Sequence, residues 1–261
     1  MPEFIIKSVG DCALCAEFAN EISVSTNRKV HALDRSIAAA NIPGVVETVP
    51  AYRTLIVHYR PEVIRYSALK AAIEQNCSVE EGNAPGGNEV IELPILYGGE
   101  VDLEPDCPKY DGWDGRETAP DLDTVLEHEK LTKEEFIRRH SANLCYVYFQ
   151  AFAISHSYVG SPVKQFTVPR RESPRTKIPR GSIAMWADQT VLNGYDLPCG
   201  WQVIGRTPVI LYDEARDPAS YCHSGQWVKF VPIDQAEYAR IRKLALAGEY
   251  TPVIYQRKEG E

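Results

Sequence analysis

Gly82-Asn83-Ala84-Pro85-Gly86-Gly87-Asn88 divides the chain of 261 residues into two parts of different character. These residues are small, flexible or turn-forming, and such a run is typical of a linker between domains. We therefore predict an N-terminal domain over residues 1–85 and a second domain over residues 89–235. A C-terminal helix and tail are expected over residues 236–261.

Before the linker, short strand and helix patterns alternate. Apolar residues recur at helical spacing from Val30 to Ala40, and Pro43-Gly44 ends that helix. Pro61 begins a second helix. Short apolar or alternating runs predict four strands, at residues 4–6, 13–18, 45–49 and 54–59. This half of the chain is therefore predicted to be a small α+β domain.

After the linker, the sequence becomes rich in strand patterns. Thr132 and Glu135 form a capping box that predicts a helix, and a last amphipathic helix is predicted over Gln235–Leu246. Between them, apolar runs separated by Pro and Gly predict strands at 146–152, 182–186, 201–204, 209–212 and 227–231. Several short strands without helices between them favour a β-barrel or a sandwich.

Composition excludes several classes of protein. The formal net charge is −8, with 28 Lys and Arg against 36 Asp and Glu, and binding to nucleic acid needs a clustered excess of cations. No window reaches the ~18 apolar residues of a membrane helix, and charges at Glu3, Lys7 and Asp11 predict no signal peptide. Seven scattered cysteines, an odd number, are typical of reduced thiols. We expect a cytoplasmic protein that binds neither nucleic acid nor membrane.

Metal and nucleotide motifs are incomplete. Cys12-x-x-Cys15 lies within a predicted strand and has no second ligand pair, and His128-Glu129 is followed by Thr132 where a zinc protease has histidine. The acidic stretch 102–118 lacks the calcium-loop register and is more typical of a solvated loop. No glycine-rich phosphate loop is present. The sequence therefore predicts no metal and no cofactor bound by this chain alone.

Two segments favour a binding site. Residues 169–180 repeat Pro-Arg at a spacing of five, which predicts a stiff extended loop that presents guanidinium groups to carboxylate or phosphate. Pairing of these arginines with the protein's own acids is an equally open interpretation. Residues 189–208 interleave Gly and Pro with Gln, Trp and Arg, which is typical of a small-molecule pocket or of tight barrel turns.

A series of short motifs, in order from residue 4 to residue 235, resembles a family whose members are called the B-type subunit of 5-oxoprolinase, allophanate hydrolase subunit 1 or sporulation-kinase inhibitor. The motifs are Gly10-Asp11-x-Ala13-Leu14, Leu93-Pro94, Tyr97-Gly98-Gly99, Pro120-Asp121-Leu122, Arg139-His140-Ser141, Tyr148-Phe149, Pro169-Arg170-Arg171, Pro174-Arg175-Thr176, Gln189-Thr190, Gly200-Trp201, Gly205-Arg206-Thr207-Pro208 and Phe230-Val231-Pro232-Ile233. The resemblance implies an α+β N-terminal domain followed by a cyclophilin-like β-barrel of the carboxyltransferase type. It also implies a homologous barrel subunit as partner and, in oxoprolinases, a LamB/YcsF-like subunit.

The chain departs from the usual family pattern in two loops. Residues 151–159 stand where relatives usually read G-F-x-P-G-F-x-Y-L. Residues 187–201 stand where relatives read close to G-G-Q-T-G-I-Y-P-x-x-S-P-G-G-W. The stretch 101–118 resembles an insertion. These changes indicate either a different amide or lactam substrate or a relative without catalysis.

The resemblance implies a non-autonomous subunit of an ATP-dependent enzyme that opens an amide or lactam, with ATP and Mg shared with the partner. For this chemistry we expect three catalytic residues: His140, Arg175 and Gln189. Substrate or phosphate binding is expected at Arg170, Arg206, Trp201 and His156. Arginines suit developing negative charge, and the Gln189 amide can both donate and accept. His140 is either a proton shuttle or a helix-end histidine, and His156 is either titratable or structural.

Two further functions stay open. One is inhibition of a sensor histidine kinase, as in the sporulation branch of the family. The other is a subunit of a biotin-dependent carboxyltransferase, whose biotin would be carried by another chain because no A-M-K-M motif is present.

Overall fold

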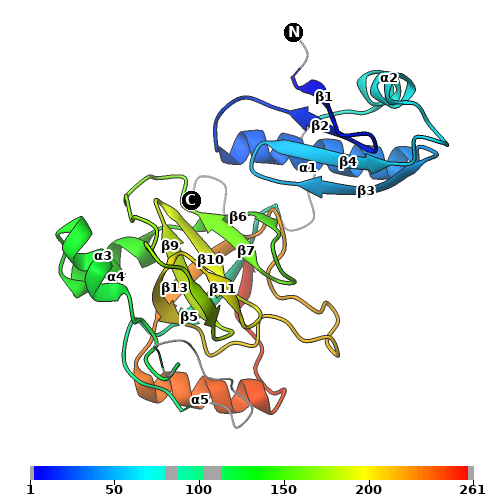
Figure 1. Ribbon diagram of the computed structural model, residues 1–261. Coiled ribbons are helices and arrows are strands. Elements are labelled where there is room, and N and C mark those ends of the chain that lie inside the picture. Colours follow the sequence, from blue (N-terminus) through cyan, green and yellow to red (C-terminus); the bar gives the residue numbers. More distant parts are fainter. Residues whose placement is uncertain (1–2, 80–86, 103–112, 114, 258–261) are drawn as a thin grey trace. The chain divides into compact units, whose positions relative to one another are not determined.

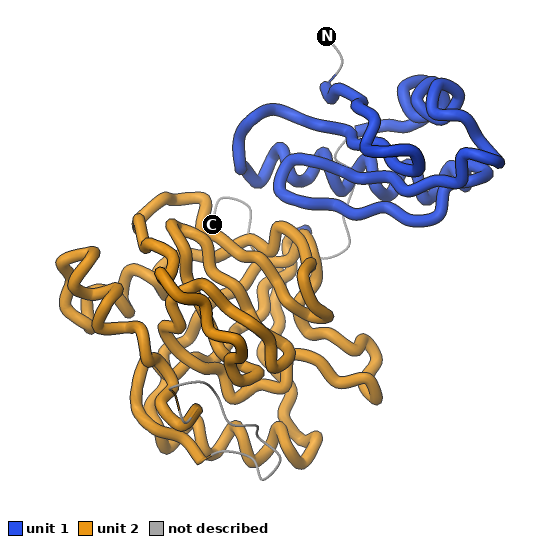
Figure 2. The backbone as a smooth tube through the Cα atoms, viewed as in Figure 1, with its two compact units in different colours: residues 1–87 blue, residues 88–261 orange. Residues whose placement is uncertain are grey.

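The computed structural model describes residues 3–79, 87–102, 113 and 115–257, which form two compact units, residues 1–87 and 88–261 (Figure 2). Residues 82–86 of the predicted linker lie outside the described residues. No helix in the described ranges is long and apolar enough to cross a membrane.

Unit 1 is a four-stranded antiparallel sheet with two helices (Figure 1). Its elements are β1 (Ile5–Val9), β2 (Ala13–Glu17), α1 (Val24–Ala40), β3 (Val45–Pro50), β4 (Thr54–Tyr59) and α2 (Tyr66–Asn76). The strand order is β1-β2-β4-β3. Buried Val30 and Leu33 of α1 and Leu69 of α2 share one apolar cluster with alternate residues of β2 and β4. The four strands and two helices predicted from apolar spacing are confirmed.

Unit 2 contains an eight-stranded sheet, a two-stranded sheet and three helices (Figure 1). The large sheet has the order β12-β9-β10-β7-β6-β13-β5-β14, and β11 pairs with β8. The strands are β5 (Glu89–Ile95), β6 (Cys145–Gln150), β7 (Ser157–Gly160), β8 (Arg175–Ile178), β9 (Ser182–Trp186), β10 (Gln189–Leu192), β11 (Leu197–Cys199), β12 (Gln202–Arg206), β13 (Trp227–Pro232) and β14 (Ile254–Gln256). The helices are α3 (Leu122–Glu129), α4 (Lys133–Ala142) and α5 (Gln235–Leu246).

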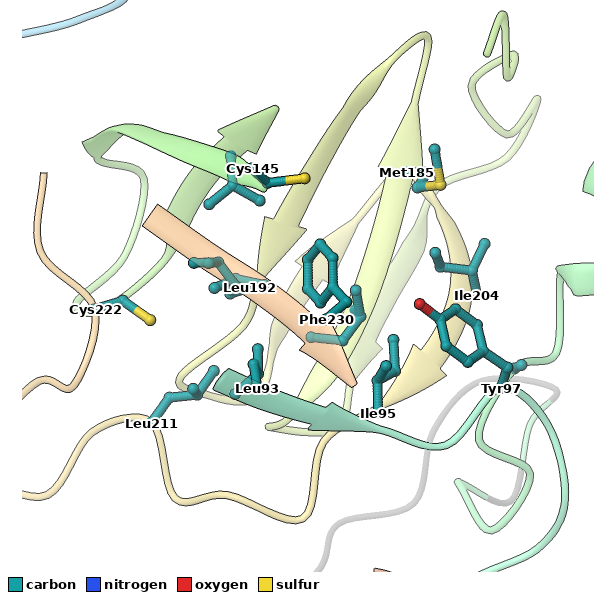
Figure 3. Packing of buried hydrophobic residues seen from close by; sticks show 14 of the residues in the cluster. Leu93, Ile95, Tyr97, Cys145, Met185, Leu192, Ile204, Leu211, Cys222 and Phe230 are labelled. Atoms are coloured by element: carbon teal, nitrogen blue, oxygen red, sulfur yellow. The ribbon is translucent and has the colours of Figure 1, made fainter. Parts of the chain in front are cut away.

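Most neighbouring strands of the large sheet are antiparallel, but β5 and β13 are parallel. Their buried side chains enter the main apolar cluster of unit 2, where Phe230 of β13 is packed among Leu93, Ile95 and Leu192 (Figure 3). Phe230 is fully buried. The cluster fixes the strands and helix α4, and so positions the functional side chains described below.

The described sheets do not close on themselves in this strand order, so the closed β-barrel expected from the sequence is not confirmed. What is shown is a mixed α/β unit with more than one sheet. Two backbone hydrogen bonds nevertheless join the end of β12 to the residue after β5: Leu96 N donates to Arg206 O at 2.9 Å, and Arg206 N donates to Leu96 O at 3.1 Å.

Local predictions in unit 2 have mixed outcomes. The start of α4 is confirmed, since the Thr132 hydroxyl accepts from the Glu135 N–H at 3.2 Å, and α5 has its predicted bounds. The strand predicted at 209–212 is wrong: within it, Tyr212 forms only an isolated bridge. The segment 169–180 is not a loop throughout, because β8 forms within it and pairs with β11.

Candidate functional site

Five aromatic rings of unit 2 form a continuous series, which we call the aromatic row. Phe152 and His156 come from the loop between β6 and β7, Tyr158 from β7, Trp201 from the residue before β12, and Trp186 from the end of β9. Successive ring centroids are 5.5, 4.9, 5.8 and 5.6 Å apart. Tilted and edge-to-face contacts at these distances are favourable.

The ends of the aromatic row are exposed, whereas its inner rings are buried or, at Tyr158, partly buried. Phe152 is 69% exposed and Trp186 is 39% exposed, against 9% for Trp201 and 4% for His156. The Arg170 guanidinium lies 4.2 Å from the centroid of the Trp186 ring. Such a cation–π contact holds a positive charge beside an apolar surface. The structure thus brings three predicted binding residues, Arg170, Trp201 and His156, into one series of contacts.

His156 has an imidazole nitrogen available for hydrogen bonding. Its Nδ1 is buried and has no hydrogen-bond partner among the described residues. Burial lowers the pKa of His156 to about 4, although the Asn193 side chain opposes this shift. The ring is therefore neutral at pH 7, when one nitrogen donates and the other accepts.

Gln189 begins β10 directly opposite Trp186 of β9 and Gly160 of β7. A Cβ placed on Gly160 would lie 2.7 Å from Gln189 Nε2, so the Gln189 amide packs directly over this glycine and would have to shift if a side chain were added. The next residue, Thr190, points to the other face of the sheet because side chains alternate along a strand. Gln189 therefore lies at the Trp186 end of the aromatic row.

His140 occupies the core on the Thr190 side. Its Nδ1 is 2.7 Å from the Tyr97 hydroxyl and its Nε2 is 3.1 Å from the Thr190 hydroxyl. Its ring stacks on Phe230 at 4.6 Å, and burial lowers its pKa to about 3. A proton shuttle at His140 is not supported by this geometry, because both nitrogens already have partners and the ring is 5% exposed. The structural alternative is favoured.

These two histidines make stability depend on pH. Histidine in the unfolded chain binds its proton near pH 6.5, whereas the folded chain binds it near pH 4 at His156 and near pH 3 at His140. The contribution of these histidines to the free energy of unfolding is therefore greatest above pH 6.5, and it falls as the pH is lowered toward 4. Urea unfolding at pH 7 and pH 5 measures the difference, and His156→Phe should reduce it. An equal difference in that variant would contradict a buried neutral His156.

Arg175 is held by Asp121, a buried residue at the start of α3 to which the sequence assigns no role. Arg175 donates twice to the Asp121 carboxylate, at 2.6 and 2.9 Å, and Arg171 also pairs with it. The Val203 N–H donates to the same carboxylate at 2.8 Å. This geometry favours the interpretation in which these arginines pair with the protein's own acids. Only the Pro120-Asp121-Leu122 motif pointed to Asp121.

Arg206 lies near Arg175 and apart from Gln189. Its guanidinium is 5.8 Å from the Trp113 ring centroid, and that of Arg175 is 5.2 Å from the same ring. Arg206 is opposite Ser182 of β9, whereas Gln189 is opposite Trp186. Four residues along a strand correspond to about 13 Å. The structure therefore groups Arg206 with Arg175 rather than with Gln189, and the predicted residues do not converge on one point.

Glycine positions of the family pattern explain part of the site's backbone. Ser155 and Ala187 stand where the family resemblance implies glycine, and both adopt left-handed conformations, with φ of +54° and +51°. A non-glycine residue pays a steric cost in this region. Both residues lie in hairpin loops that lead into the strands of the aromatic row. The loops thus keep the backbone that glycine favours and carry different side chains.

Within residues 3–79, 87–102, 113 and 115–257, no cluster of three or more His, Cys, Asp or Glu is placed to hold a metal ion. Of the acidic stretch 102–118, residues 103–112 and 114 lie outside the described residues. Neither Cys12 nor Cys15 is in a disulfide.

The fold and the order of motifs define a class of protein. The carboxyltransferase domain family, subdomains C and D, matches residues 4–222, and the chain belongs to this family. Among its relatives, the B-type subunit of 5-oxoprolinase from Bacillus subtilis (strain 168) is 30% identical over 243 residues, which cover 89% of this chain and 94% of that protein. The Escherichia coli O157:H7 protein of the same name is 28% identical and covers 86% and 94%. The resemblance stated from the motifs is confirmed.

Solved structures share the fold. The urea amidolyase of K. lactis has a TM-score of 0.74 at 14% identity, covering 98% of this chain and 17% of that chain. The Kluyveromyces lactis urea carboxylase has a TM-score of 0.73 at 14% identity, covering 97% and 24%.

Proposed function

We propose that the protein is one subunit of an ATP-dependent complex that opens a small amide or lactam similar to 5-oxoproline. The observation that carries the proposal is the match to the B-type subunit of 5-oxoprolinase over 94% of that relative's length. Its site is the aromatic row with Arg170 and Gln189.

The residues of this site suit the chemistry. A planar amide can stack on Trp186 or Phe152, and Gln189 can donate to its oxygen and accept from its N–H. In the reaction we propose, the γ-phosphoryl group of ATP passes to the amide oxygen and ADP leaves. One water then adds to the carbon, and the C–N bond breaks as the nitrogen takes up a proton. A second water hydrolyses the resulting acyl phosphate to carboxylate and phosphate. Arg170 stabilises the negative charge that develops during these steps. Mg arrives with the nucleotide.

The site needs a partner because its ends are open to solvent. Phe152 and Trp186 are the exposed ends of the aromatic row, and covering them would exclude water and strengthen the charge interactions inside. We propose that a homologous barrel subunit covers them, with a LamB/YcsF-like subunit completing the complex. The six free cysteines of the described residues suit a reducing compartment, and we place the complex in the cytoplasm.

A cyclophilin-like barrel remains our proposal for residues 89–235, following an N-terminal domain over 1–85 and preceding the helix and tail over 236–261. The Leu96–Arg206 hydrogen bonds support it, since they connect β12 with the end of β5. These bonds bring the edge strand β12 to the end of β5 that β14 does not cover, which leaves less of the sheet edge open.

Co-expression with the homologous subunit tests the proposed function. We expect one peak in size-exclusion chromatography, an interface of at least about 1,200 Å², and ATP consumption that requires 5-oxoproline. The chain alone should show no turnover. Arg170→Gln should lower kcat/KM of the complex by about tenfold or more, as expected for a lost charge-assisted hydrogen bond. Arg138→Gln, on the exposed surface of α4, is the matched control.

Other outcomes decide between the alternatives. Two separate monomer peaks, or full activity from the chain alone, would overturn the subunit proposal. ATP consumption that requires urea and a biotin carrier would favour the carboxyltransferase. Inhibition of a sensor kinase by the isolated chain would favour the kinase inhibitor.

A further inference from the structure

A second candidate site lies beside α5, outside the aromatic row. It is a cavity of about 480 Å³, which we call the α5 cavity, and this volume falls in the usual range of small-molecule sites. Gln235, Tyr238, Ala239, Arg242, Lys243 and Leu246 of α5 line it. Their spacing of three and four residues places them on one face of the helix.

Charge is concentrated in the α5 cavity. Among the described residues, its lining contains five cationic side chains and three acidic ones, although the chain as a whole has a net charge of −8. The cations are Arg116, Arg180, Arg206, Arg242 and Lys243, and the acids are Glu100, Asp102 and Asp196. Long ion pairs connect Arg116 with Glu100 at 3.7 Å and Arg180 with Asp196 at 3.8 Å. The lining therefore keeps a formal excess of two positive charges.

One of the arginines is buried and a second is partly buried, where charge is costly. Arg206 is 4% exposed, and it is hydrogen-bonded to the Tyr238 hydroxyl. Arg242 donates to the Pro208 carbonyl at 3.1 Å, and burial lowers its pKa. Both arginines line the α5 cavity. An anion bound there would offset the cost of burying them.

We propose that the α5 cavity binds a phosphorylated small molecule, with its phosphate groups at Arg206, Arg242 and Lys243. Guanidinium forks match phosphate oxygens, and a phosphate ester carries the two negative charges that the lining lacks. Apolar Val101, Ala239 and Leu246 would contact the uncharged part of the ligand. The proposal does not rest on the proposed function, because it concerns binding by this chain alone.

Isothermal titration of the purified full chain with pyrophosphate, ATP and glutamate tests this site. We expect binding of pyrophosphate and ATP that weakens as salt is raised. Arg242→Gln should weaken it by about tenfold or more, since one hydrogen bond to a charged group is lost. Lys243→Gln changes an exposed side chain, so it should weaken binding without lowering Tm. Arg240→Gln is the matched control, because Arg240 pairs with Glu237 on the exposed side of α5.

Each outcome bears on the proposal. Tighter binding of ATP than of pyrophosphate would show that the apolar wall holds the nucleoside, and equal binding would show that phosphate suffices; both support the site. No binding of either ligand at millimolar concentration, equal weakening by Arg240→Gln, or glutamate bound as tightly as pyrophosphate would overturn it.

Discussion

Asp121→Asn should lower the free energy of unfolding of unit 2 by about 3–5 kcal/mol, the usual cost of removing one partner from a buried ion pair. Asp121 is 2% exposed, and its carboxylate accepts from Arg171, Arg175 and the Val203 N–H. The substitution removes the negative charge but keeps the shape, so both arginines stay near the core without a counter-ion. Arg175→Ala should also lower Tm, against the sequence-based expectation of a catalytic arginine.

Urea unfolding of the full chain measures this loss. Asp123→Asn is the control, because Asp123 lies in the first turn of the same helix but is exposed. This substitution should lower the free energy of unfolding only by the helix-dipole contribution of about 0.3–1 kcal/mol. If the Asp121→Asn variant has the same free energy of unfolding as the wild type and its complex loses activity, the carboxylate serves the reaction rather than the fold.

Phe230→Ala should lower the free energy of unfolding by about 3–5 kcal/mol, because removing a fully buried aromatic ring leaves a cavity that the surrounding side chains fill only in part. Phe230 is 0% exposed and stacks on His140. Strand register places it beside Leu93 of β5. The loss therefore loosens both the β5–β13 pair and the packing of α4.

The matched control is Val231→Ala, the next residue of β13, whose side chain is only partly buried. In chemical denaturation, Val231→Ala should lower the free energy of unfolding by much less than Phe230→Ala. A loss below about 1 kcal/mol for Phe230→Ala would be too small for a close-packed core.

Local structure was predictable where the contacts that form it lie within one short stretch of sequence. Thr132 caps α4 with a residue three positions away, and α5 carries its apolar residues at helical spacing. The parallel pairing of β5 with β13 was not predictable, since no local pattern records which strand a sequence will join. For the same reason the sequence of β8 predicts a loop: its partner strand β11 follows some 20 residues later.

The candidate site was predictable in part. Arg170, Trp201 and His156 were expected from their motifs, and the structure connects them through Tyr158 and Trp186. His140 and Arg175 were assigned to chemistry because a sequence does not show burial or a distant counter-ion. Asp121 lies 54 residues from Arg175 along the chain, and only the fold brings them together.

The position of β5 has a consequence for synthesis on the ribosome. β5 lies between β13 and β14, so both of its neighbours are made long after it. Gln226, which precedes β13, donates to Glu89 at the start of β5 across 137 residues. At about 5–20 residues per second, that interval lasts roughly 7–30 s. During this time the apolar β5 has no strand to pair with, so a nascent chain stalled before β13 should be a substrate for chaperones and should not fold unit 2.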